Sequence, residues 1–261
     1  MTAKTEQSTQ GTKLLHNRVA LITGASKGIG AAIAKLFAKH GAAVGVNYRS
    51  SKEEAQQVVA EITNDGGRAI AVQADVLDKA QVDSMLERVA TEFSAVDTLV
   101  LNANMPFTIA PFMEQTWSEF ESKLTGELKA AFYCCKAAIP SMTEHKCGCI
   151  IAISSITSRH ADPCFSAHTT AKSGLDGLVK SLATELGQHG IRVNAVAPGV
   201  TLTDPVSAQP QEWLDSRAKE TPMKRNAQPD DIAGGVLLLA SESAGFITGT
   251  YLMVNGGSQM L

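Results

Sequence analysis

The chain has 261 residues, of which 44% are hydrophobic and 19% are charged, and its formal net charge at pH 7 is −3. This length and composition suit one large α/β domain with a sizeable buried core. No run of basic residues points to a nucleic-acid partner, and apolar runs such as 236–240 are too short to cross a membrane.

Residues 1–16 are polar and lack the apolar core of a secretion signal. We expect them to form a disordered tail, and we expect residues 17–261 to form the folded domain. The missing signal predicts a cytoplasmic protein, in which the five cysteines stay reduced. His145, Cys147 and Cys149 lie close together in the sequence, but a structural zinc site needs four ligands, so we expect no metal.

Short β-rich runs alternate with helical stretches along the chain. The strands are expected at 18–23, 43–47, 69–73, 98–101, 149–153, 192–197 and 251–254. The helices are expected at 31–40, 52–64, 78–93, 165–188 and 230–239, with a further long helix ending near Pro140. Residues 201–221 contain two prolines and predict a loop with short helices, of the kind that forms lids. This order predicts a single-domain, Rossmann-type α/β fold: a doubly wound parallel sheet with helices on both faces.

A glycine-rich segment, Thr23-Gly24-x-x-x-Gly28-x-Gly30, follows the first predicted strand. Glycines allow a tight turn and close approach to a pyrophosphate, and the next helix offers free N–H groups. A purely structural turn is the alternative, but the position in the first strand–helix unit favours a dinucleotide site. The expected contacts come from Gly24, Ser26, Lys27, Gly28, Ile29 and Gly30.

The end of the second predicted strand indicates which cofactor is preferred. An acidic residue there would bind the ribose 2′-OH of NAD, but this chain has Asn47, Tyr48, Arg49 and Ser50. A guanidinium suits a 2′-phosphate, so NADP(H) is favoured over NAD(H). The alternative is that Arg49 is merely solvated.

Ser155 follows the fifth predicted strand, and Lys172 lies in the helix after it. With the glycine loop, this spacing resembles the short-chain dehydrogenase/reductase family over nearly the whole chain, about 17–261, and is similar to bacterial β-ketoacyl-acyl-carrier-protein reductases. The resemblance implies further cofactor contacts from Asp75, Val76, Asn102, Ala103, Lys172, Pro198, Gly199, Val200 and Thr203.

Three positions depart from the family's pattern. His168 occupies the position of the catalytic tyrosine, and Asn104 that of a glycine after the fourth strand. Glu127 aligns with the asparagine of the catalytic helix, although the segment after Trp117 is about three residues longer than usual.

The resemblance implies a catalytic set of Ser155, His168, Lys172 and Glu127. An imidazole, with its ordinary pKa near 6.5, can carry a proton at neutral pH. Lys172, one helical turn away, should lower that pKa, and Glu127 would offset the effect if it reached the lysine. Because histidine is shorter than tyrosine, a water molecule is one way to bridge it to the substrate. The alternative is that His168 has no catalytic role and only fills the space of the tyrosine.

Three hypotheses follow. The first is an NADPH-dependent reductase of a β-ketoacyl-like or related carbonyl, either small or carrier-bound, with His168 as proton donor or with a substrate group supplying the proton. The second is a cofactor-binding, non-catalytic subunit that pairs with an active relative in a hetero-oligomer. The third is a lyase or isomerase with His168 as base. The cofactor loop, Ser155 and Lys172 favour the first, and the resemblance together with the apolar run 246–254 predicts a homotetramer.

Overall fold

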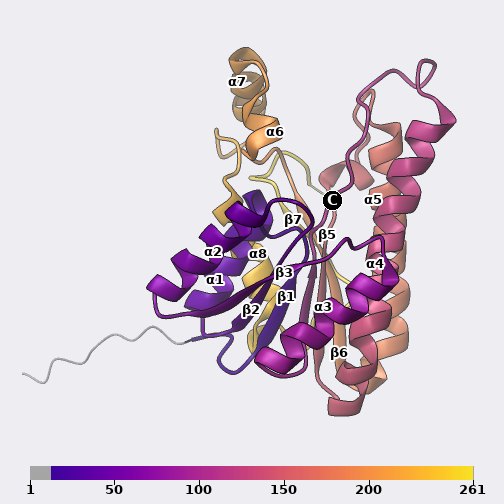
Figure 1. Cartoon of the computed structure of the whole chain (residues 1–261). Coiled ribbons are helices and arrows are strands. Elements are labelled where there is room, and N and C mark those ends of the chain that lie inside the picture. Colours follow the sequence, from indigo (N-terminus) through magenta and orange to yellow (C-terminus); the bar gives the residue numbers. More distant parts are fainter. Residues whose placement is uncertain (1–12, 261) are drawn as a thin grey trace, which may run out of the picture.

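The computed structural model describes residues 13–260. Seven strands form one sheet in the order β3-β2-β1-β4-β5-β6-β7, and every neighbouring pair is parallel (Figure 1). The strands are β1 Val19–Ile22, β2 Ala43–Tyr48, β3 Arg68–Gln73, β4 Thr98–Leu101, β5 Gly148–Ile153, β6 Ile191–Pro198 and β7 Tyr251–Val254. The predicted Rossmann-type fold is confirmed, with each strand close to its expected bounds.

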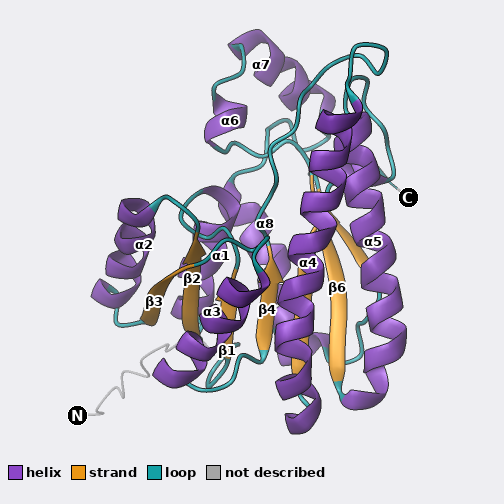
Figure 2. Cartoon of the chain, turned by 45° about the vertical axis from the view of Figure 1, so that its right-hand side comes forward, coloured by secondary structure: helices purple, strands orange, loops and turns teal. Residues whose placement is uncertain are grey.

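Helices cover both faces of the sheet (Figure 2). They are α1 Gly28–Lys39, α2 Lys52–Asn64, α3 Lys79–Glu92, α4 Trp117–His145, α5 Ser166–Leu186, α6 Asp204–Ser207, α7 Gln211–Glu220 and α8 Pro229–Ala240. One core cluster joins the sheet to α1, α2 and α8, and a second joins it to α3, α4 and α5. None of the helices that the structure describes is long and apolar enough to span a bilayer.

Strand β1 shows why the sheet forms two cores. Ala20 and Ile22 lie in the first cluster, whereas Val19 and Leu21 lie in the second. Side chains alternate between the faces of a strand, and a parallel sheet covered on both sides therefore needs an unbroken apolar run.

Two expectations about boundaries need correction. Residues 1–12 of the expected tail lie outside the described residues, but Leu15 is only 1% exposed and its amide donates to the carbonyl of His40. The folded part therefore begins before residue 17. The long helix does not end near Pro140 but continues to His145, because Met142 is buried in the core and Lys146 ends the helix with a φ of 51°.

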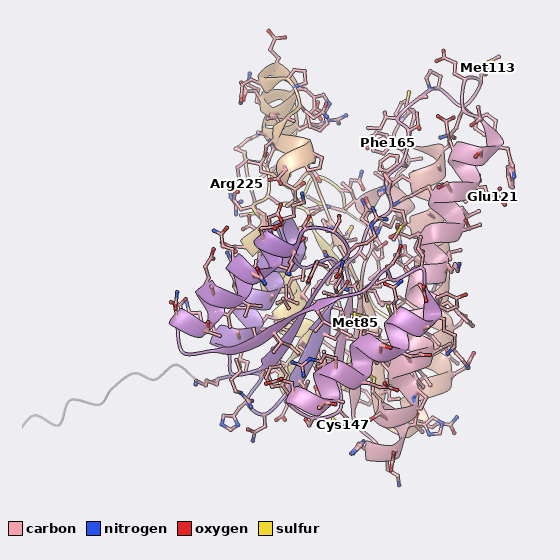
Figure 3. The ribbon with its side chains drawn as sticks, viewed as in Figure 1. Met85, Met113, Glu121, Cys147, Phe165 and Arg225 are labelled. Atoms are coloured by element: carbon pink, nitrogen blue, oxygen red, sulfur yellow. The ribbon has the colours of Figure 1, made fainter. Side chains whose placement is uncertain are left out.

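The strand order reverses between β1 and β4, and ligands of such sheets bind at the carboxyl ends of the strands beside this point. Two projections rise above these ends (Figure 1). One carries α6 and α7, and the other contains the connection after β4 and the neighbouring ends of α4 and α5. Met113 and Phe165 lie on the second projection (Figure 3).

Candidate active site

The glycine loop makes the tight turn expected from its sequence. Gly24 and Gly28 have φ values of 60° and 57°, which favour glycine. Gly30 has a different role from the expected cofactor contact. A Cβ atom there would lie 2.5 Å from Nδ2 of Asn102, so Gly30 permits close packing beneath the loop and does not line the cleft above it.

Asn47 supports the loop from below. It is 2% exposed, and its Oδ1 accepts a hydrogen bond of 3.0 Å from the amide of Gly24. Its Nδ2 donates to the carbonyl of Ala74 at 3.1 Å. The side chain of Asn47 thus joins the ends of β1, β2 and β3, and the residue also lies in the lining of the cleft above the loop.

A cleft of about 440 Å³ lies at the carboxyl ends of these strands. Its lining includes most of the predicted cofactor residues, namely Gly24, Ser26, Lys27, Gly28, Ile29, Asn47, Tyr48, Arg49, Ser50, Asp75, Val76, Asn102, Ala103 and Thr203. Pro198, Gly199, Val200 and Lys172 do not line it. Gly199 and Val200 instead border a smaller cavity beside Arg225.

The cleft fits an extended dinucleotide. It contains the positive-φ glycines and the beginning of α1, where backbone N–H groups suit a pyrophosphate. Arg49 and Ser50 are exposed at its β2 end, and no carboxylate occurs among residues 47–51. Lys27, Arg49 and Ser50 would hold a phosphate there.

Ser155 caps the short turn Ile156–Ser158 immediately after β5. Its Oγ accepts hydrogen bonds from the amide of Thr157 at 3.2 Å and from Oγ1 of Thr157 at 2.9 Å. The hydrogen of the Ser155 hydroxyl therefore remains available to donate. The Ser155 carbonyl accepts from the Tyr251 hydroxyl at 2.7 Å, which fixes the backbone of the turn.

Lys172 and Glu127 are in direct contact. Lys172 Nζ donates to Glu127 Oε1 at 2.5 Å and to the Ile153 carbonyl at 2.7 Å. The second oxygen of Glu127 accepts from Lys123 Nζ at 2.6 Å. Burial would raise the pKa of Glu127, but the ammoniums of Lys172 and Lys123 outweigh burial and lower it to about 2. Glu127 is therefore an anion between two cations.

His168 lies one turn before Lys172 on α5. Its ring stacks on Phe107 with a centroid distance of 4.6 Å, and its Nδ1 is buried without a hydrogen-bond partner in the described structure. Burial, reinforced by the charges of Lys172 and Lys123, lowers the pKa of His168 to about 3, although Glu127 acts in the opposite direction. This low pKa disfavours the imidazolium form at neutral pH, and whether His168 donates a proton stays a prediction.

Cys147 and Cys149 lie at the beginning of β5, at the opposite end of the strand from Ser155. Cys147 accepts a hydrogen bond from Arg18 at 2.7 Å, and Cys149 is buried in β5. Within residues 13–260, no group of three or more His, Cys, Asp or Glu side chains is placed to hold a metal ion.

Two residues of the site were missed in the sequence. Phe107 covers the His168 ring, and Lys123 supplies the second cation beside Glu127. Lys123 lies four residues before Glu127, a spacing that places oppositely charged side chains together on a helix. That signal was available, whereas nothing local indicated that Phe107 would reach α5.

Comparisons with known proteins identify the family of this chain. Residues 24–259 match the family model described as enoyl-(acyl carrier protein) reductase. The chain is 40% identical over 243 residues to the 3-oxoacyl-(acyl-carrier-protein) reductase FabG of Staphylococcus aureus, covering 92% of this chain and 98% of the relative. A mutant of a Serratia marcescens short-chain dehydrogenase/reductase has a TM-score of 0.87 at 32% identity, covering 95% of this chain and all 100% of the other.

A 7α-hydroxysteroid dehydrogenase, solved with NADH and 7-oxo glycochenodeoxycholic acid, has a TM-score of 0.89 at 32% identity, covering 94% of this chain and 96% of the other. The family match and the level of identity over almost the whole chain are sufficient to assign the family. The chain belongs to the short-chain dehydrogenase/reductase family and is an oxidoreductase similar to the FabG ketoacyl reductases.

Proposed function

We propose that the protein is an NADP(H)-dependent reductase that converts a carbonyl group to an alcohol with an atypical set of Ser155, His168 and Lys172. The observation that carries this proposal is the cleft described above, because Met105 and Pro106 line it and the next residue in the chain, Phe107, stacks on His168. A dinucleotide cleft thus adjoins the residues expected to act on substrate.

NADPH, when bound, supplies the hydride. The carbonyl oxygen of the substrate then gains negative charge and needs hydrogen-bond donors. The Ser155 hydroxyl has a hydrogen available for this oxygen, and Lys172 has two of its three ammonium hydrogens engaged, by Glu127 and Ile153. In this proposal the third hydrogen of Lys172 would bind the cofactor ribose.

His168 acts in this proposal as a neutral hydrogen-bond donor. With a pKa of about 3, only about one imidazole in 10⁴ is protonated at pH 7, so imidazolium is a poor source of protons. A neutral imidazole N–H polarises a carbonyl in other enzymes, where the surroundings likewise lower the histidine pKa. Water or a substrate group supplies the proton itself. The same low basicity argues against a lyase or isomerase that uses His168 as its base.

The substrate class follows from the relatives, whose names include a 3-oxoacyl-(acyl-carrier-protein) reductase. We propose a β-ketoacyl-like or related ketone, small or carrier-bound. The test is single-turnover oxidation of NADPH with a β-ketoacyl thioester, the same acyl group on carrier protein and a simple ketone. We expect Ser155→Ala to lose about 10²–10³-fold in rate and the exposed Ser122→Ala to lose nothing.

If NADPH binds but no member of the panel oxidises it, the non-catalytic subunit is the better interpretation, and mixing with an active relative becomes the next experiment. If Ser155→Ala retains the wild-type rate on an accepted substrate, the assignment of Ser155 is wrong.

The preference for NADP(H) is tested separately by titrating NADPH and NADH. We expect wild type to bind NADPH at least about 10-fold more tightly, because charge-assisted hydrogen bonds to a phosphate contribute about 1.5–3 kcal/mol. Arg49→Ala should remove most of this preference. Arg68→Ala, at the opposite end of the neighbouring strand β3, is the control. Equal affinities in wild type would contradict the proposal.

We also propose that the protein assembles as a homotetramer. Phe246 is fully exposed and Ile247 is 39% exposed, and both shortly precede β7, the strand at one edge of the sheet. Apolar side chains gathered at an edge strand suit contact with further copies. Light scattering at micromolar concentration tests this, and a monomer would contradict it.

A further inference from the structure

Lys123 has no place in the proposed reaction so far, yet it is the most completely buried charged residue of the site. Its side chain is 0% exposed within α4. Burial of an ammonium is costly unless each of its hydrogens finds an acceptor. Lys123 meets this condition, because Nζ donates to Asn104 Oδ1 at 2.7 Å, to the Met105 carbonyl at 2.9 Å and to Glu127 Oε2 at 2.6 Å.

These three acceptors belong to different parts of the site. Asn104 and Met105 form part of the wall of the dinucleotide cleft, whereas Glu127 faces Lys172. Asn104 also occupies the position at which the sequence departs from the family's glycine, so its carboxamide oxygen is a feature of this chain. The hydrogen bonds therefore run without a break from the cleft wall through Lys123 and Glu127 to Lys172.

We infer that Lys123 is a positioning residue, whose ammonium fixes the cleft wall at Asn104 and Met105 to Glu127 and thereby holds Lys172 in place. The inference rests on the proposed function for its effect on turnover. The geometry on which it depends does not require a bound cofactor.

Space filling alone does not account for Lys123. A methionine would occupy a similar volume but would leave Asn104 and the Met105 carbonyl without their donor, and it would leave Glu127 with one cation instead of two. Lys123 Nζ also lies 5.4 Å from the centre of the Phe107 ring, on whose surface His168 stacks. Removal of the ammonium should therefore disturb both Lys172 and the support of His168.

The experiment compares Lys123→Met with Lys136→Met, which removes an exposed lysine from the same helix. Circular dichroism and the unfolding midpoint establish that both variants are folded. We expect Lys123→Met to lower kcat by about 10²-fold, as small displacements of catalytic groups do, with a smaller change in KM. The dissociation constant of NADPH, measured by fluorescence, should rise at least threefold, and Lys136→Met should match wild type.

A double-mutant cycle separates positioning from a general loss of structure. Because Lys123 acts on Lys172 through Glu127, the double variant Lys123→Met with Glu127→Gln should lose less in log kcat than the sum of the two single losses. Additive losses in log kcat, or a folded Lys123→Met whose kcat and NADPH affinity stay within twofold of wild type, would overturn the inference.

A third measurement needs neither substrate nor cofactor. In the ligand-free protein, the ¹H–¹⁵N ammonium signal of Lys172 should shift in Lys123→Met and not in Lys136→Met. An unchanged signal overturns the inference. If the signal shifts in a protein that reduces no carbonyl, the inference about Lys123 is supported and the proposed function is wrong. Failure of the inference can therefore be distinguished from failure of the proposed function.

Discussion

Replacing Glu127 by glutamine should destabilise the protein more than any other isosteric change of a charged residue at the site. The carboxylate is only 3% exposed and separates the ammoniums of Lys123 and Lys172. Glutamine offers one carbonyl oxygen, and its NH₂ group would have to face the other ammonium. Breaking a buried ion pair from one side costs about 3–5 kcal/mol.

A second estimate comes from titration. Lowering the pKa of Glu127 from 4.5 to about 2 corresponds to about 3 kcal/mol of stability at neutral pH. Because the pKa is lower in the folded state, this contribution is complete above about pH 4.5 and is lost as the pH falls toward 2. The two estimates agree, and about 3 kcal/mol corresponds to a fall in Tm of about 6–12 °C in a domain of this size.

The assay is thermal and urea unfolding at pH 7, followed by circular dichroism. The control is Glu121→Gln, which changes an exposed glutamate on the outer side of the same helix (Figure 3). We expect Glu121→Gln to lie within about 0.5 kcal/mol of wild type. Repeating the comparison toward pH 3 should narrow the gap between Glu127→Gln and wild type. If the two glutamine variants unfold at the same midpoint at pH 7, or the gap does not narrow, the electrostatic account of Glu127 is wrong.

Three further predictions concern the loop, the histidine and the serine turn. Gly30→Ala would place a Cβ atom 2.5 Å from Asn102 Nδ2. It should therefore lower the free energy of unfolding by about 1–3 kcal/mol and weaken NADPH binding. Calorimetry that shows wild-type stability and affinity would refute this. His168→Asn, which retains a neutral N–H donor, should keep more activity than His168→Ala. Because the pKa of His168 is about 3, the wild-type rate of hydride transfer should show no imidazole step between pH 5 and 9. A step near pH 6.5 that disappears in His168→Ala would show that the imidazole is protonated after all. Tyr251→Phe removes a hydrogen bond of 2.7 Å to the Ser155 carbonyl. It should lower the free energy of unfolding by about 0.5–1.5 kcal/mol and slow turnover. An unchanged rate of hydride transfer would mean that the turn needs no support from β7.

Local patterns in the sequence were sufficient to predict the sheet, the helices that cover it and the glycine loop. The sheet is indicated by apolar runs such as that of β1, because a parallel sheet is buried on both faces. The loop is indicated by its glycines, which permit the positive φ found at Gly24 and Gly28. The same local reasoning failed at Pro140. A proline usually ends a helix, but here the burial of Met142 holds the last turn together.

The resemblance to the family was sufficient to select Ser155, His168 and Lys172 as candidates, but not to assign the charge states of the histidine and the lysine. Lys172 meets Glu127, 45 residues away, because α4 and α5 pack side by side on one face of the sheet. The neutrality of His168 depends on its burial beside Phe107 and on a second cation, Lys123, neither of which its own neighbours in the sequence reveal. A pKa is set by everything within a few ångströms of the group, and only tertiary packing decides what lies there.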